Sequence, residues 1–330
     1  MTPPAPDASL APFIHAMGRG PSRARNLTRA EAAEAMRLML VGHAAPEAVA
    51  AILMLMRYRG ETADEIAGMA GALRDTLGGW TGPDVALDWP SYAAGRTRGL
   101  PWFLLAARLV AGAGHRVVLH GWNSHQVAAA SVRAALPTLG IGVAETPDAL
   151  SRLLDRDAIA YVPLEALSPG VFRLLSLRGV LGLRSCINTV LRVLNPFGAA
   201  AAVQGVFHPP YRGLQADAGA LLGQRNLLVL KGVGGEFERH PSKEVELFGL
   251  LDGAPVDLGA HILRPETRRL ADTDPRPGDL AALWQGTRTD PFAQAVVTGT
   301  AALALLALRA APDLPAAESR ARALWHDCAT

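Results

Sequence analysis

Lysine and cysteine are scarce in this chain. Of 32 basic residues only Lys231 and Lys243 are lysines, so nearly every positive charge is a guanidinium. Arginine suits bidentate phosphate contacts, but the excess, beside abundant alanine, glycine and proline, is more simply explained by a GC-rich coding bias. Cys186 and Cys328 are too few and too far apart for a disulfide framework or a paired-cysteine metal site. This cysteine content fits a reducing compartment, and we expect a cytoplasmic protein.

The chain also lacks a long uninterrupted apolar run and a secretion signal. The longest run, about residues 295 to 308, is interrupted by Thr298, Gly299 and Thr300. It is too short for a membrane span and predicts a buried helix. The segment before residue 8 is rich in proline and alanine, without the basic and apolar regions of a signal peptide. We therefore expect no membrane partner.

The chain does contain enough apolar material for a large core. It has 330 residues, of which 50% are hydrophobic, and a formal net charge of +2. This length predicts two domains of unequal size. The charge neither requires nor excludes a polyanionic partner.

Residues 1 to 26 are expected to form an N-terminal arm. The arm carries Arg19, Arg23 and Arg25 close to two glycines. Short basic arms are common, so a solvated terminus is favoured over an arm that binds nucleic acid.

A small helical domain is predicted over residues 27 to 79. Thr28 and Glu31, and then Thr62 and Glu65, have the spacing of capping boxes, in which a hydroxyl and a carboxylate satisfy free amides at a helix start. We expect helices around residues 168 to 195 to join this domain.

The remaining residues, 80 to 330, predict a large α/β domain. Short apolar runs alternate with helical segments: the expected strands are at 85–88, 116–120, 158–162 and 227–230, and the expected helices are at 101–112, 124–136 and 148–155. Such alternation predicts a mainly parallel sheet flanked by helices. A hairpin around Asp252 and Gly253, spanning 247–258, and three helices within 278–327 are expected to follow.

One loop of this domain has the position of an anion site. Asp88 ends a predicted strand, and Pro101 suits a first helical turn because its missing N–H needs no partner there. Free N–H groups and the positive end of the helix dipole favour an anionic ligand at such a place. The loop supplies Arg96 and Arg98, but no glycine cluster that would let a phosphate reach the backbone.

Several motifs resemble one family. Leu27-Thr-Arg-Ala-Glu-Ala32 and Arg59-Gly-Glu-Thr-Ala-Asp-Glu-Ile-Ala67 resemble the small helical domain of anthranilate phosphoribosyltransferase and the related pyrimidine nucleoside phosphorylases. Leu181-Gly-Leu-Arg-Ser-Cys-Ile-Asn188 and Leu194-Asn-Pro196 resemble the family's LGxRTxxN and NP signatures. The resemblance extends over about residues 12 to 327. It implies the nucleoside phosphorylase/phosphoribosyltransferase fold, in glycosyltransferase family 3.

The family's donor-binding motifs are altered in this chain. Trp89-Pro-Ser-Tyr-Ala-Ala-Gly-Arg96 stands where the family binds the diphosphate of phosphoribosyl pyrophosphate with a GTGGD loop. Bulky side chains there would obstruct the approach of the diphosphate to backbone N–H groups. The KHGN motif has lost its lysine. The residues that remain from the family's site are His120, Gly121, Asn123 and Asn188.

The family's metal-binding motif is altered as well. Phe237 stands at the first position of the Asp-Glu pair that would hold magnesium, and Glu238 keeps the second. Because magnesium usually needs one or two carboxylates plus substrate phosphate oxygens, Glu236 with Glu238 is the substitute pair under a transferase hypothesis.

The replaced motifs resemble a side branch of the family, the YbiB-type proteins. The features in question are the YAxxR…LPW loop from Tyr92 to Trp102 and the GGExER run from Gly234 to Arg239. This resemblance implies the transferase fold, a homodimer formed through the small helical domain, and binding of DNA or RNA without marked sequence preference.

From this branch we expect an arginine-lined former active cleft that binds phosphates, with aromatic rings that stack on unpaired bases. The expected anion-binding or nucleic-acid-binding residues are Arg96, Arg98, Arg178, Arg184, Arg192, Lys231 and Arg239. The expected stacking residues are Tyr92, Trp102 and Trp122. By the resemblance, Arg178 aligns with the position where the transferase binds the carboxylate of anthranilate.

Two hypotheses of function follow. The favoured one is a non-catalytic, homodimeric protein that binds DNA or RNA and needs no cofactor. The alternative is a phosphoribosyltransferase that uses phosphoribosyl pyrophosphate and magnesium. The altered donor and metal motifs favour the first hypothesis, whereas the near-neutral net charge counts against it.

Overall fold

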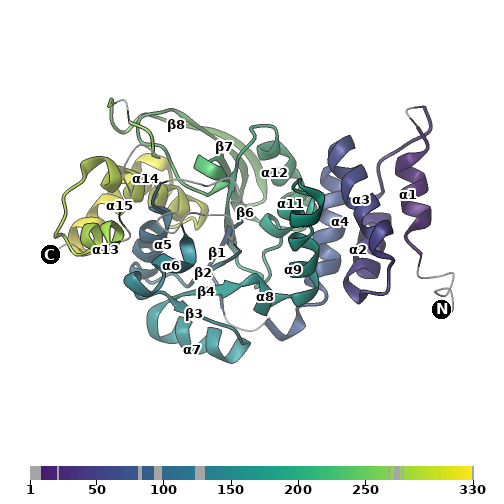
Figure 1. The fold of residues 1–330 in the computed structure, drawn as a ribbon. Helices are drawn as coiled ribbons and strands as arrows, with labels where there is room; N and C mark the ends of the chain where they lie inside the picture. The colour runs from purple at the N-terminus through teal and green to yellow at the C-terminus, as the bar shows by residue number, and fades with distance from the viewer. Residues whose placement is uncertain are drawn as a thin grey trace.

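The computed structural model describes residues 9–20, 22–80, 84–92, 99–122, 131–266, 268–270, 276 and 278–328. Over these residues the chain forms a small helical domain followed by an α/β domain built on one sheet (Figure 1). The purple and blue helices of the N-terminal part lie at one end of the molecule, the yellow C-terminal helices lie at the other, and the sheet stands between them. The predicted fold class is confirmed.

In residues 9–20 and 22–80, the N-terminal part forms four α-helices: α1 (Ala11–Gly18), α2 (Arg29–Val41), α3 (Pro46–Arg59) and α4 (Ala63–Arg74). Both predicted capping boxes are present. At the start of α2, the Glu31 amide donates to Thr28 Oγ1 (3.2 Å) and the Thr28 amide donates to the Glu31 carboxylate (2.8 Å). Thr62 and Glu65 repeat this arrangement at the start of α4.

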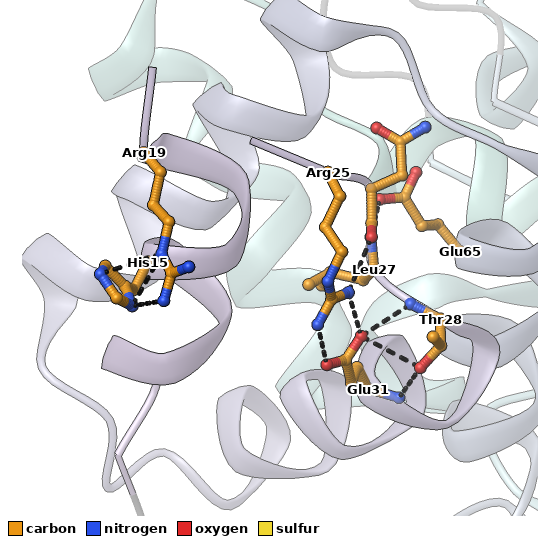
Figure 2. A network of polar contacts seen from close by, with 8 residues as sticks. His15, Arg19, Arg25, Leu27, Thr28, Glu31 and Glu65 are labelled. Atoms are coloured by element: carbon orange, nitrogen blue, oxygen red, sulfur yellow. Dashed lines mark hydrogen bonds and ion pairs between the residues drawn. The ribbon is translucent and has the colours of Figure 1, made fainter. Parts of the chain in front are cut away.

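Helix α1 lies within the segment expected to be an arm. Leu10 and Met17 are buried against the neighbouring helices. Because about two turns of helix separate them, both side chains lie on the same face of the helix. Arg25 forms an ion pair of 2.6 Å with Glu31, and Arg19 donates to His15 (Figure 2). The 8 residues of this helix are too few to show a helical period, which is why the sequence predicts only an arm here.

Glu65 ties two parts of the helical domain together. Its side chain is buried and accepts a hydrogen bond from the Leu27 amide at 2.8 Å, in addition to capping its own helix (Figure 2). The capping carboxylate of α4 thereby fixes the approach of the chain to α2.

The α/β domain is organised around a sheet with the strand order β3-β4-β2-β1-β5-β6-β7-β8 in the described part of the chain. The parallel strands are β1 (Leu87–Ser91), β2 (Val117–Gly121), β3 (Gly142–Val143), β4 (Ile159–Pro163), β5 (Ala201–Val206) and β6 (Asn226–Lys231). The antiparallel strands β7 (Val245–Leu251) and β8 (Ala254–Ala260) form the predicted hairpin around Asp252 and Gly253.

The strand order reverses beside β1. From β1 the chain goes to β2 and on to β4 on one side, and then crosses to β5 on the other side. In open α/β sheets, ligands bind outside the carboxyl ends of the strands at such a switch point. The ends of β1 and β5 are therefore where this fold predicts a site.

Helices cover both faces of the sheet and fill the segments between strands. They are α5 (Phe103–Gly112), α6 (Val132–Ala135), α7 (Pro147–Asp157), α8 (Leu164–Leu167), α9 (Pro169–Ser176), α10 (Arg178–Leu181), α11 (Ile187–Arg192), α12 (Tyr211–Leu221), α13 (Asp279–Trp284), α14 (Pro291–Ala307) and α15 (Leu314–Cys328). Short 3-10 helices are η2 (Gly78–Trp80), η4 (Pro137–Leu139) and η5 (Val233–Gly235).

Alternate residues of the strands face two different cores. Leu87 and Trp89 of β1 pack on the side of α5 and α14, whereas Val118 of β2 faces the side that also holds residues of α2, α4 and α11. This is the period of two expected for strands buried on both faces. Figure 1 shows α9, α11 and α12 between the sheet and α4.

The C-terminal part matches the prediction of three helices, and α14 is the buried helix expected from the long apolar run. Across the described ranges, no helix has the length and apolar character needed to cross a bilayer. The helix expected at 101–112 begins at Phe103, slightly later than predicted. Of the helix expected at 124–136, residues 124–130 lie outside the described residues.

Candidate functional site

A pocket of about 280 Å³ lies at the switch point. It is formed by the end of α3, the α10–α11 segment, the end of β5 and the start of α12. The small helical domain and the α/β domain thus both contribute to its lining. Four of the lining residues are arginines: Arg57, Arg178, Arg184 and Arg192.

Arg192 holds the floor of this pocket against the end of β1. Its guanidinium is 7% exposed and donates to the carbonyl of Tyr92 (3.1 Å) and to the carbonyl of Asn188 (3.2 Å). Burial lowers the pKa of Arg192 to about 10, although the carboxylate of Glu236 opposes this shift. The side chain therefore remains a cation at neutral pH.

Arg184 lies half-buried at the wall of the pocket. Burial lowers the pKa of Arg184, and the neighbouring charges of Arg178 and Arg57 lower it further. All three arginines line the same pocket, so their like charges repel one another there. The pocket is consequently a place of positive potential.

Another part of the lining contains a hydrogen-bonded chain. Arg57 Nη1 donates to the hydroxyl of Tyr211 (3.1 Å), and this hydroxyl donates to Glu61 Oε2 (2.7 Å). Burial and the Glu61 carboxylate raise the pKa of Tyr211 to about 12, so its proton stays in place at neutral pH. Sequence analysis missed these three residues. Glu61 lies within the motif that begins at Arg59, and Arg57 stands just before it, which was a usable signal, but nothing local singles out Tyr211.

Apolar side chains complete the lining. Leu183, Val206 and Phe207 face the pocket, and Phe207 is 45% exposed. A surface that combines apolar carbon with several guanidinium groups suits a flat ring that carries an anionic substituent.

Below the end of β1 lies a buried polar chain. The Tyr92 hydroxyl is 2.8 Å from His120 Nδ1, and His120 Nε2 is 3.2 Å from Asp88 Oδ1. His120 is thus a strand-end residue whose Nδ1 has a hydrogen-bond partner, whereas Nε2 lies near Asp88 without forming a hydrogen bond among the described residues. Tyr92 is buried, so the prediction that it stacks on a base is wrong.

The other two predicted stacking residues differ in burial. Trp102 is buried at the start of α5, so it cannot stack on a base. Trp122 is partly buried and packs edge-on against Phe172, with ring centroids 5.4 Å apart. Its stacking role stays a prediction.

The predicted anion-binding residues that the structure describes lie in different places. Arg178, Arg184 and Arg192 come together in the pocket. Lys231 is exposed at the end of β6. Arg239 is completely buried and forms an ion pair of 2.7 Å with Glu318 of α15, so the prediction that it binds a ligand anion is wrong.

Three further predicted residues, Arg96, Arg98 and Asn123, lie outside the described residues. Of the other residues kept from the family's site, Gly121 is buried against the main chain of Ser91, where any Cβ would collide. Asn188 lies in the pocket wall on α11.

The two carboxylates expected to bind magnesium, Glu236 and Glu238, are both buried, at 0% and 1% exposed. Phe237, at the position of the first carboxylate, is buried and packs edge-on against Trp89 at 5.6 Å. Glu236 is buried and accepts a hydrogen bond of 2.9 Å from Ser91 Oγ, beside the Arg192 cation. Among the described residues, no three His, Cys, Asp or Glu side chains are grouped as metal ligands. Neither Glu236 nor Glu238 belongs to the described lining of the pocket, so the magnesium site stays a prediction.

A small helical domain beside a mainly parallel sheet, with a basic pocket between them, defines a glycosyltransferase architecture. The family model described as "Glycosyl transferase family, helical bundle domain" matches residues 11–77. Relatives then extend the similarity to the whole chain. Anthranilate phosphoribosyltransferase of Moorella thermoacetica is 32% identical over 304 residues, covering 88% of this chain and 87% of the relative. That of Methylobacterium nodulans is 30% identical over 322 residues, covering 95% and 93%.

The chain belongs to the anthranilate phosphoribosyltransferase family. Solved structures agree on the fold. Anthranilate phosphoribosyltransferase from Thermus thermophilus superimposes with a TM-score of 0.78 at 24% identity, covering 98% of this chain and 95% of that chain. The enzyme from Saccharomyces cerevisiae, solved in complex with PRPP and Mg, gives 0.77 at 15% identity, covering 97% and 94%.

These findings overturn our main functional prediction, a non-catalytic protein that binds DNA or RNA. Relatives that cover nearly the whole chain are named for an enzyme activity, which favours the alternative hypothesis. They give no support to the YbiB-type branch. The structure supplies a physical reason as well, because Tyr92, Trp102 and Arg239 are enclosed in the protein. The expected homodimer stays a prediction.

Proposed function

We propose that this chain is a phosphoribosyltransferase whose acceptor is an aromatic amine carrying a carboxylate, the class to which anthranilate belongs. The observation that carries the proposal is the composition of the pocket. Guanidinium groups of Arg178, Arg184 and Arg57 face a space that also has an apolar wall. Charge-assisted hydrogen bonds from arginine to carboxylate are short and geometrically specific, so they would fix the orientation of the ring.

The place of the pocket in the sheet supports the same proposal. The pocket opens at the end of β5, and β5 pairs directly with β1. The family resemblance assigns the donor's diphosphate to the loop after β1. An acceptor in the pocket would therefore lie beside the donor sugar, which is the proximity that group transfer requires.

The reaction exchanges one bond for another at the anomeric carbon of the donor. The amine nitrogen forms a C–N bond, the C–O bond to diphosphate breaks, and the nitrogen gives up one proton. Arg192 is a buried cation joined to the described end of β1 through its hydrogen bond to Tyr92. It would stabilise the negative charge that develops on the leaving group. We assign no step to a metal ion, because neither Glu236 nor Glu238 belongs to the described lining of the pocket.

The test is direct transfer. Purified protein is mixed with anthranilate and phosphoribosyl pyrophosphate, with magnesium in one series and a chelator in the other, and loss of anthranilate fluorescence is followed. We expect turnover in the wild type and a loss of kcat/KM for the acceptor of about tenfold or more in R184Q, the value of one lost charged hydrogen bond.

The matched control is R152Q, because Arg152 is an exposed arginine on α7, away from the pocket. It should keep the wild-type rate. The proposal fails if the folded wild type converts neither anthranilate nor ring-substituted anthranilates in either series. It also fails if R184Q and R152Q behave alike.

A further inference from the structure

The pocket carries more positive charge than one carboxylate requires. Its described lining contains four arginines and, as the single acidic residue among them, Glu61. The carboxylate of Glu61 already accepts the hydrogen bond of Tyr211, whose oxygen in turn accepts from Arg57. The acidic group of the pocket is thus engaged at one wall.

The Arg192 cation is compensated from below rather than from within the pocket. The buried Glu236 carboxylate stabilises its charged form, and two main-chain carbonyls accept its N–H groups. This leaves Arg184, between α10 and α11, as the arginine of the pocket without such compensation from the described residues.

Arg184 is the most informative arginine of the pocket. The side chain is half-buried and makes no hydrogen bond or ion pair with any residue in the described part of the chain. Holding a partly desolvated guanidinium next to the cations of Arg178 and Arg57 is unfavourable. An anion bound between them would remove both the desolvation cost and the mutual repulsion.

We propose that the acceptor of this chain carries two anionic groups, one held by Arg178 and the second by Arg184 with Arg57. This inference rests on the proposed function, because it specifies the acceptor of that same pocket. A second carboxylate and a sulfonate or phosphate offer the same chemistry to a guanidinium, so the experiment includes both kinds.

The experiment is calorimetric binding to the intact protein without donor, so that it does not depend on catalysis. The probes are anthranilate, the isomeric aminobenzenedicarboxylates that keep an amino group beside one carboxylate, and the sulfonated anthranilates. We expect at least one doubly charged probe to bind about tenfold or more tightly than anthranilate, and this preference to weaken as salt is raised. Whether the best probe is a dicarboxylate or a sulfonate identifies the second group.

Variants locate the effect. In R184Q the ratio of the two affinities should fall close to one, while R152Q should keep the wild-type ratio. The inference is overturned if no doubly charged probe binds more tightly than anthranilate, if none binds at all, or if R184Q retains the preference. Transfer to anthranilate without any preference for a dianion would leave the proposed function standing and remove this inference alone. The reverse, tight dianion binding without transfer to any of these amines, would leave the pocket assignment standing and remove the activity.

Discussion

The ion pair between Arg239 and Glu318 offers a sharp test of the structure, because Arg239 was predicted to bind a ligand and instead lies in the core. Its side chain is 0% exposed and that of Glu318 is 6% exposed, with 2.7 Å between Nη1 and Oε1. Arg239 also donates to the His261 carbonyl (2.7 Å), and its main-chain N–H donates to Thr300 Oγ1 (2.9 Å). Burial lowers the pKa of Arg239, and Glu318 opposes this shift.

The perturbation is Glu318→Ala, which leaves the guanidinium enclosed without its carboxylate. Removing one partner of a buried ion pair costs about 3–5 kcal/mol. The His261 carbonyl remains as a partner for Arg239, so we expect the lower end, about 3 kcal/mol. The matched control is Glu266→Ala, whose pair with Arg264 is 3.3 Å long and 38% exposed on each side. That change should cost less than about 1 kcal/mol.

A double variant separates charge burial from packing. Replacing both members with apolar residues, Arg239→Met with Glu318→Leu, removes the need to desolvate any charge at this position. Buried pairs replaced in this way are often neutral in stability or better. We therefore expect the double variant to lie within about 1 kcal/mol of wild type.

The measurement is urea unfolding followed by circular dichroism, with the free energy of unfolding taken by linear extrapolation. If Glu318→Ala costs no more than Glu266→Ala, the pair is not buried as described. If the double variant is as unstable as the single one, packing rather than an uncompensated charge dominates at this site. The transfer assay adds a second readout, since a structural Arg239 predicts normal acceptor kinetics in the double variant.

Other predictions follow from the same structure. Hydrogen bonding to Arg25 lowers the pKa of Glu31 from 4.5 to about 2, so its contribution to stability is present above pH 4.5 and is lost as the pH falls through 2. In Glu31→Gln, the free energy of unfolding should therefore depend less on pH between pH 4.5 and about 2 than it does in the wild type. A Cβ at Gly232 would collide with the main chain of the following loop, so Gly232→Ala should lower the melting temperature clearly. Burial raises the pKa of Cys186, and Cys328 is exposed, so a thiol reagent should titrate one cysteine in the native protein and two after denaturation.

Local signals account for the parts of the fold that could be predicted. The capping boxes at Thr28 and Thr62 depend only on neighbouring residues, and both appear at the predicted helix starts. Strand β5 was missed because Ala201-Ala-Val-Gln-Gly-Val206 is rich in alanine and glycine, which are poor strand formers. Its conformation is set by pairing with β1 and β6, a contact that no local pattern reveals.

The candidate site shows the same division. Arg178 and Arg184 were found through motif resemblance, and they do face one pocket. Arg239 stands in a motif that is just as recognisable. In the structure, however, it contacts Thr300 of α14 and Glu318 of α15 instead of facing the pocket. A motif gives the position of a residue along the chain, but the surroundings of its side chain depend on how the elements pack.

The prediction of a nucleic-acid-binding protein was wrong for a physical reason: the altered motifs concern only one of the two substrates that a transferase binds. The altered motifs belong to the donor side: the loop after β1, the end of β2, and Phe237, which lies in the core. The acceptor side that we propose is lined by residues of α3, α10, α11 and the start of α12, and it contains several guanidinium groups. Counting altered motifs therefore measures only one half of a two-substrate site. Arg57, Glu61 and Tyr211 come from segments 150 residues apart yet share one hydrogen-bonded chain. Such a chain is a reason to test acceptor binding first, because the acceptor wall is the half of the site whose residues and charges the structure defines.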